Sequence, residues 1–153
     1  MRPNFLVLTL VGLGCGLSLC VARTTAAQAP APPCTFLTAA QVGGAIGSKV
    51  DAGEAIGTTG CSWSTPAGTT HVVVTLSFWP PQRFGEMPPM PNVTRVNLNG
   101  VGDQAFYVTM GTLTSLSVKR KSSVFVLHVY GLPGTQKQMA AEKSLALDVV
   151  SKL

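Results

Sequence analysis

The chain has 153 residues and a formal net charge of +5, and 46% of its residues are hydrophobic while only 11% are charged. This length allows a single domain, and the composition excludes a disordered, highly charged chain. The sequence contains no basic stripe with interleaved aromatic residues, so we expect no nucleic-acid partner.

The first 27 residues predict a secretory signal. Arg2 is followed by the apolar run FLVLTLVGLGCGLSLCVA at residues 5–22 and then by small and polar residues, which is the order of a signal peptide. Cleavage after Ala27 removes Arg2 and Arg23, and the formal charge falls from +5 to +3. The alternative is a retained membrane anchor through residues 5–22, because this run reaches the lower length limit of a spanning helix.

Removal of the signal leaves two cysteines. Cys15 and Cys20 leave with it, whereas Cys34 and Cys61 remain. An exported chain meets an oxidising compartment, so we expect these two to form a disulfide. A reactive or metal-binding cysteine pair is disfavoured, because the CxxC spacing and a neighbouring histidine are both missing.

The remaining sequence divides into a linker and a domain. Residues 28–33, QAPAPP, predict a short extended linker stiffened by proline, and residues 34–153 predict one domain. The domain begins with a short helix, since Thr38 and Gln41 have capping-box spacing. Gly47 follows at the position of a C-terminal cap. Two further glycines within the helix, Gly43 and Gly44, are poor helix formers, and we expect them to let it approach a sheet closely.

Alternating apolar residues predict about five antiparallel strands. They fall in the segments GCSWST (60–65), TTHVVVTLSFW (69–79), QAFYVT (104–109), TLTSLSV (112–118) and VFVLHVYG (124–131). In the second of these, Val72, Val74, Leu76 and Phe78 share one face, and His71 and Trp79 lie on the other. Five prolines between residues 80 and 92 exclude regular structure there, so this stretch is a long loop or a crossing segment.

The stretch NLNGVGDQAFYV at residues 97–108 predicts a structural turn followed by a strand. Gly100 and Gly102 permit positive backbone angles, and Asp103 can accept hydrogen bonds within the turn. A phosphate cradle is excluded, because no helix begins after these glycines.

A longer helix closes the chain. Thr135 is the expected cap, and residues 136–153 carry an apolar stripe at helical spacing. We expect the polar face to be in solvent, with Lys137, Glu142, Lys143, Asp148 and Lys152. The predicted fold class is therefore α+β, with an antiparallel sheet of about five strands, a short N-terminal helix and a longer C-terminal helix packed on it.

The order of five motifs resembles a large group of small exported bacterial domains of unknown function. The motifs are CTFLTAAQVGGAIG, GCSW, VNLNGVGDQAFY, SVFVLHVYG and AAEKSLALDVVSKL. Many proteins in this group are lipoproteins, as in actinobacteria. The resemblance implies an envelope or secreted location, the Cys34–Cys61 bridge, and a structural turn at Gly102, Asp103 and Ala105. This chain differs in lacking a good lipobox before Cys15 or Cys20.

The sequence gives little support to catalysis. His71 and His128 are the only histidines, and both are predicted on the same sheet face, where they are weak candidates for a metal site. No GxSxG elbow occurs, and no two carboxylates are brought together by the predicted elements. We expect no catalytic residue and no cofactor.

The proline-rich segment carries the candidate binding residues. Trp79, Phe84, Met87 and Met90 lie in or beside it, and aromatic and methionine side chains adapt to apolar partners. The other interpretation is that they cap one end of the core. Trp63, beside Cys61, is expected to pack against the disulfide.

Together these features predict an exported, noncatalytic envelope or secreted domain. Its expected partner is a protein or a small apolar ligand, with membrane contact only through an uncleaved signal or a lipid anchor. The alternative is a small periplasmic hydrolase or metal-dependent enzyme that uses His71 and His128.

Overall fold

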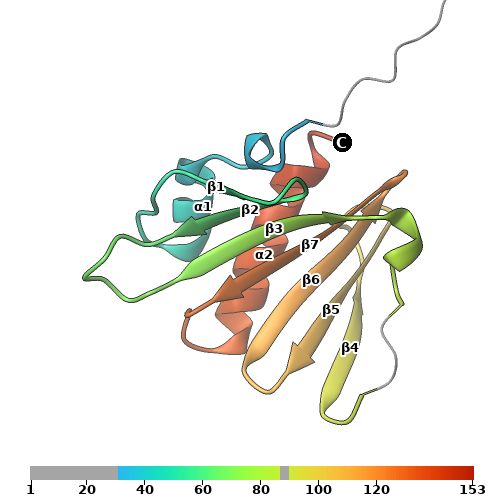
Figure 1. Ribbon diagram of the computed structural model, residues 1–153. Helices are drawn as coiled ribbons and strands as arrows, with labels where there is room; N and C mark the ends of the chain where they lie inside the picture. The colour runs from blue at the N-terminus through green and yellow to red at the C-terminus, as the bar shows by residue number, and fades with distance from the viewer. Residues whose placement is uncertain (1–30, 87–89) are drawn as a thin grey trace, which may run out of the picture.

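The computed structural model describes residues 31–86 and 90–153 and has an α+β fold (Figure 1). The predicted fold class is confirmed. In chain order the elements are η1 (Pro33–Thr35), α1 (Ala39–Ile46), β1 (Glu54–Ile56), β2 (Gly60–Ser64), β3 (Val73–Trp79), η2 (Pro81–Arg83), β4 (Val93–Leu98), β5 (Gln104–Met110), β6 (Leu113–Arg120), β7 (Ser123–Tyr130) and α2 (Thr135–Val150). The predicted signal, residues 1–27, lies outside the described residues, as do residues 28–30 of the predicted linker.

The strands form a single antiparallel sheet in the order β1-β2-β3-β7-β6-β5-β4. The prediction of about five strands was wrong, because the sheet has seven. The two unpredicted strands, β1 and β4, are at the edges. All three residues of β1 are exposed, as are the four central residues of β4, so neither strand shows the alternation of a half-buried strand.

The proline-rich segment is the crossing segment between β3 and β4. Since β3 pairs with β7 and β4 lies at the far edge, the chain passes three strands on its way between them. The prediction that the prolines exclude regular structure was wrong in one detail. Pro81–Arg83 form one turn of 3₁₀ helix, with proline at its first position where no amide donor is needed.

The predictions for the first helix are largely confirmed. The Gln41 amide donates to Thr38 Oγ1 at 3.2 Å and the Thr38 amide donates to Gln41 Oε1 at 3.0 Å, which completes the capping box. Gly47 ends the helix with a φ of 73°. The expected close approach of Gly43 and Gly44 to the sheet was wrong. A Cβ on Gly43 would meet the Ser48 carbonyl oxygen of the next loop at 2.9 Å, and one on Gly44 would meet nothing within 4 Å.

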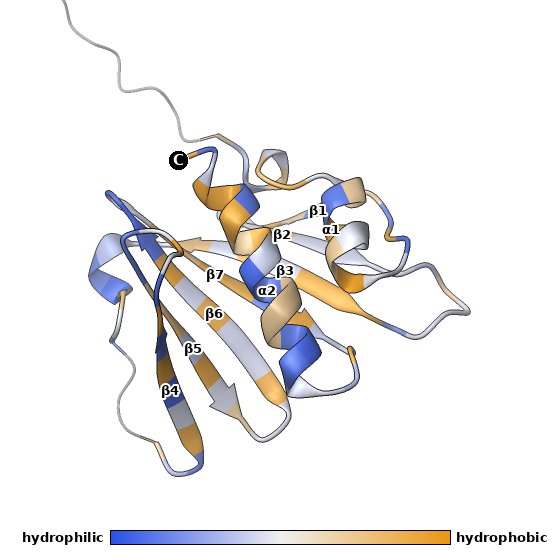
Figure 2. Ribbon diagram, turned by 180° about the vertical axis from the view of Figure 1, so that it is seen from behind, coloured by the Kyte–Doolittle hydropathy of each residue, from blue (hydrophilic) through white to orange (hydrophobic). Residues whose placement is uncertain are grey.

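Both helices cover the same face of the sheet (Figures 1 and 2), as predicted for α2. Two expectations for α2 were wrong. Its N-cap is Gly134, without a side-chain cap, and Thr135 is already helical. Glu142, expected in solvent, is completely buried.

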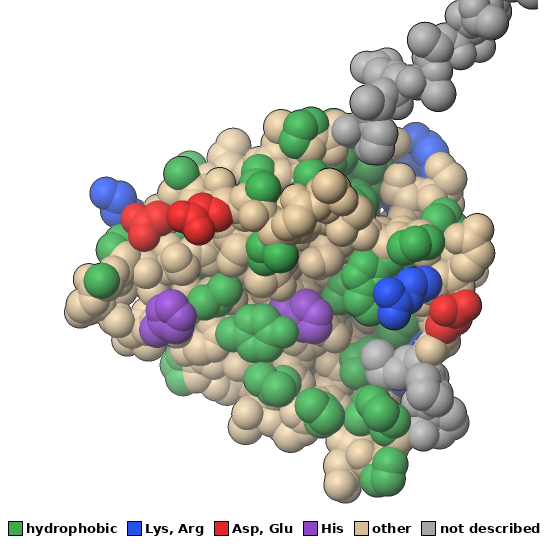
Figure 3. Space-filling model, in the orientation of Figure 1, with side chains coloured by type: hydrophobic (Ala, Val, Ile, Leu, Met, Phe, Trp, Pro, Cys, Tyr) green, Lys and Arg blue, Asp and Glu red, His purple; other side chains and the backbone are tan. Residues whose placement is uncertain are grey.

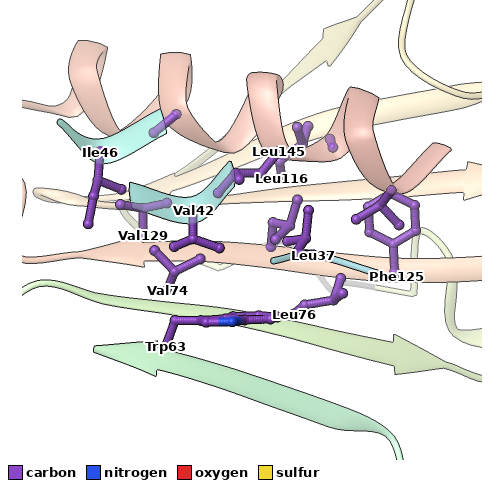
Figure 4. Packing of buried hydrophobic residues seen from close by; sticks show 14 of the residues in the cluster. Leu37, Val42, Ile46, Trp63, Val74, Leu76, Leu116, Phe125, Val129 and Leu145 are labelled. Carbon is purple, nitrogen blue, oxygen red and sulfur yellow. The ribbon is translucent and has the colours of Figure 1, made fainter. Parts of the chain in front are cut away.

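The main core lies between the helices and the sheet (Figure 4). Leucine and valine side chains of β3, β6 and β7 meet those of the two helices there, and burial of each such side chain stabilises the fold by about 1.5–3 kcal/mol. The predicted disulfide is confirmed, since Cys34 and Cys61 are bonded. Trp63 is buried, and a Cβ on Gly53 would lie 2.6 Å from Trp63 Nε1 and 2.8 Å from Cys61 Sγ, so the indole and the disulfide flank the same glycine.

Within the part of the chain that the structure describes, no helix has the length and apolar character needed to cross a membrane.

Candidate functional site

The sheet face opposite the helices carries the candidate site, and we call it the open face. Figure 3 looks onto it and shows hydrophobic side chains gathered over its centre, with basic and acidic side chains at the right-hand margin. Strand pairing brings one set of alternating residues to this face: Thr75, Ser77 and Trp79 of β3; Val124, Val126 and His128 of β7; Ser115 and Ser117 of β6; and Phe106 and Val108 of β5.

The open face holds a second apolar layer. Phe106, Val108, Val124 and Val126 are buried although none belongs to the main core cluster. Because α1 and α2 lie on the opposite face, the cover on this side comes from the crossing segment, whose η2 contacts β7. The sheet is therefore apolar on both faces along β5 and β7.

A cavity of about 210 Å³ lies between the crossing segment and the open face. We call it the aromatic hollow. Its lining includes Trp79, Phe84, Phe106, Val124 and Val126. The Phe84 and Phe106 rings lie 5.2 Å apart and tilted by 58°, a favourable aromatic geometry. The segment after η2 thus forms one wall, and strands β5 and β7 form the other.

Two arginines lie on the rings of this hollow. The Arg83 Cζ is 4.8 Å from the Trp79 ring centroid, and the Arg95 Cζ is 3.6 Å from the Phe106 ring centroid. Both distances are within the range of cation–π attraction. Within residues 31–86 and 90–153, the one ion pair joins Arg120 to Asp103. Neither Arg83 nor Arg95 is therefore paired with a carboxylate of these residues.

A second cavity, of about 230 Å³, occupies the opposite end of the open face. Its lining includes Met90, Val108, Met110, His128 and Tyr130. The His128 and Tyr130 rings stack with centroids 5.4 Å apart. Burial lowers the pKa of His128 below its ordinary value, against the opposing effect of a hydrogen bond to the Thr114 backbone, so the neutral ring is favoured.

The two histidines are not brought together. His71 is exposed and precedes β3, four residues before Thr75, the residue paired with His128. Four residues of extended chain span about 13 Å, and Figure 3 shows the histidine side chains well apart. Across the described ranges, no three His, Cys, Asp or Glu side chains are grouped so as to hold a metal ion.

The predicted binding residues separate into two groups. Trp79 and Phe84 line the aromatic hollow, whereas Met90 lines the second cavity. Met87 lies outside the described residues. Neither Trp79 nor Phe84 belongs to the main core cluster or packs against it, which speaks against their capping the core.

The wall of the aromatic hollow that the sheet forms was not predicted from the sequence. The sequence did not single out Phe106, Val124 or Val126, nor the two arginines that lie over the rings. A signal was present in VFVLHVY, because a strand that is apolar at nearly every position is covered on both faces.

A buried polar cluster lies on the other side of the sheet, around Glu142. The Val129 amide donates to Glu142 Oε1 at 3.2 Å, and Thr114 Oγ1 lies 3.0 Å from the same oxygen. Oε2 has no hydrogen-bond partner. Burial raises the pKa of Glu142 to about 7, although the bonds from Thr114 and Val129 act in the opposite direction.

The hydrogen-bond geometry also favours a neutral Glu142. Thr114 Oγ1 lies 3.1 Å from Gln138 Oε1 as well as 3.0 Å from Glu142 Oε1. The Thr114 hydroxyl has one proton and can donate to only one of them. Both contacts become hydrogen bonds when a protonated Glu142 donates to Thr114 and Thr114 donates to Gln138. Glu142 lines neither cavity of the open face, so the cluster is part of the packing of α2.

The glycine turn between β4 and β5 makes hydrogen bonds to the β6–β7 turn. Asp103 accepts from Arg120 Nη1 at 2.7 Å and from the Lys121 amide at 2.6 Å, and these bonds lower its pKa. Gly102 has a φ of 61°, and a Cβ there would lie 2.6 Å from the Lys119 carbonyl oxygen. The turn therefore fixes the positions of two hairpins relative to each other.

Comparison of the chain with protein-family models, curated proteins and solved structures finds no significant match. The geometry of the open face therefore carries the functional argument.

Proposed function

We propose that this chain is an exported, noncatalytic domain that binds a small apolar ligand in the aromatic hollow. The observation that carries the proposal is a cavity of about 210 Å³ on the sheet face opposite α1 and α2, walled by Trp79, Phe84, Phe106, Val124 and Val126. Apolar concave sites with a few polar groups are the usual form of small-molecule sites.

The size of the hollow suits a small occupant. Pockets for drug-sized ligands measure roughly 300–1,000 Å³, and an apolar cavity of about 150 Å³ can hold benzene. A volume of about 210 Å³ therefore fits one ring or a short acyl chain. This volume favours a small-molecule ligand over a protein partner, because a protein partner needs a larger complementary surface.

Export is supported by one observation beside the predicted signal. The Cys34–Cys61 disulfide is typical of an oxidising compartment. This bridge agrees with a periplasmic or secreted domain.

A third apolar hollow, of about 310 Å³ beside Phe36 and Phe78, is a less suitable site. Its lining includes Ala31 and Leu153, so it lies at the two ends of the described domain and not on the open face. The hydrolase or metal-enzyme alternative has no comparable observation in its favour, because His71 and His128 lie apart.

Calorimetric titration of the purified protein with octanol tests the proposal. We expect saturable binding of one equivalent, and Phe84→Ala should weaken it about tenfold, since the ring forms one wall of the hollow. Met110→Ala is the matched control, because this apolar side chain is exposed at the other end of the open face. Absence of saturable binding, or equal losses in the two variants, would overturn the proposal.

A further inference from the structure

A polar hollow of about 380 Å³ adjoins the aromatic hollow at the β4–β5 end of the sheet. Phe84 and Phe106 line both, so the two rings stand between them. The lining of the second is mainly polar and includes Asn97, Asn99 and Gln104. A ligand that extends past the two rings thus passes from an apolar to a polar environment.

Arg95 stands at this junction. Its guanidinium lies over the Phe106 ring and would be 3.6 Å from a Cβ on Gly85, so it bridges β4 and the crossing segment. A guanidinium attracted to a ring face still has N–H groups that can donate to another acceptor. Because Arg95 is exposed, an incoming ligand can reach these donors.

The charges around the two hollows favour an anion. Arg83 lines the aromatic hollow and Arg95 the polar one. The acids on the linings are Glu86 and Asp103. Asp103 is already paired with Arg120, and Glu86 is exposed and makes no ion pair with either arginine. An oxyanion beside Arg95 would therefore meet donors without displacing an existing partner.

We infer that the ligand is a small amphipathic carboxylate, with its apolar body in the aromatic hollow and its carboxylate on Arg95 at the edge of the polar hollow. This rests on the proposed function, because the apolar body occupies the same cavity. Guanidinium–carboxylate bonds are charge-assisted and often bidentate, which gives them more strength and direction than bonds between neutral groups.

Octanoate and octanol, titrated separately at neutral pH, test the inference, since they share a chain and differ in the head group. We expect octanoate to bind about tenfold more tightly than octanol. Arg95→Gln should reduce octanoate affinity to that of octanol and leave octanol affinity unchanged. Arg95→Lys keeps the positive charge but cannot make a bidentate bond to a carboxylate, so it should retain only part of the tighter binding of octanoate relative to octanol. Lys137→Gln, a loss of the same charge from α2, should have no effect.

The possible results separate the two proposals. Equal affinity for both compounds, or a preference for octanoate that survives in Arg95→Gln, overturns the inference while octanol binding still supports the apolar site. Binding of neither compound overturns both.

Discussion

Glu142 is enclosed between α2 and the sheet with one carboxylate oxygen unpartnered. A charged carboxylate in this position is unfavourable, because its lost hydration is only partly replaced by the bonds from Thr114 and Val129. The spacing of Glu142 places it on the apolar stripe of α2, three residues before Leu145 and four before Ala146, but a charged side chain is ordinarily expected in solvent, so its burial was not predicted. Its protonation therefore links the packing of α2 to pH.

The pH dependence of stability should show this linkage. The pKa of Glu142 is about 7 in the folded protein against an ordinary value of 4.5, so the folded state binds the proton more tightly. The stabilising contribution is fully present below about pH 4.5 and is lost as pH rises through about 7, with a loss of about 3 kcal/mol. Urea denaturation at several pH values measures it.

Glu142→Gln is the informative variant, because its amide is neutral at every pH. Its free energy of unfolding should lack the decline between about pH 4.5 and 7 that the native protein shows. Ser144→Ala, an exposed change on the same helix, should keep the decline. Parallel profiles for the native protein and Glu142→Gln would contradict a buried, titrating Glu142.

Gly102 and Gly100 provide a second comparison between single residues. Both have positive φ, but only Gly102 lacks room for a Cβ, which would meet the Lys119 carbonyl oxygen at 2.6 Å. Gly100→Ala should cost about 1 kcal/mol for backbone strain alone. Gly102→Ala adds a steric clash with a backbone atom, so its loss in free energy of unfolding should be at least about twice as large. Equal losses would show that the backbone of β6 at Lys119 moves enough to accommodate the added Cβ.

At the scale of elements, the sequence predicted best where local chemistry decides the structure. The first helix is an example, because Thr38, Gln41 and Gly47 supply both ends of it locally. The alternating core residues of β3 and β7 were equally informative, since Leu76 and Leu127 pair on one face.

Strands that are defined by pairing with a neighbouring strand, and not by a hydrophobic pattern in their own sequence, could not be predicted. β1 and β4 are exposed edge strands, and pairing with β2 and β5 defines them. The candidate site was predicted only in part for the same reason, because its strand residues are brought to it by neighbouring segments. Trp79 and Phe84 are visible beside the prolines, but their meeting with Phe106 depends on the path of the crossing segment. Capping at Thr135 failed because Gly134 takes that position without a side chain.

The disulfide connects the start of the domain to β2. The bonded cysteines are 27 residues apart, and closing a loop of that length stabilises the fold by about 3.5 kcal/mol through the entropy of the unfolded chain. The double variant Cys34→Ser, Cys61→Ser should lose roughly this amount in urea denaturation. Reduction of the native protein is the matching control and should give a similar loss. An unchanged midpoint in both would show that the bridge does not contribute to stability.

For the whole molecule, the main consequence of the topology is a sheet with two unlike faces. Placing both helices on one face leaves Phe106, Val124 and Val126 on the other, where the crossing segment covers them in part. A strand as apolar as β7 needs cover on both sides. On the open face that cover is incomplete, and the remaining space is the aromatic hollow in which we place the ligand.

Amide chemical shifts of the isotope-labelled protein, recorded during titration with octanol, test this claim most directly. We predict saturable changes concentrated around Phe84 and in the open-face parts of β5, β6 and β7, near Phe106, Ser117 and Val126, with α1 and α2 unaffected. Changes centred on the helices or on the hollow beside Phe36, or no saturable change at all, would contradict the assignment of the open face as the binding surface.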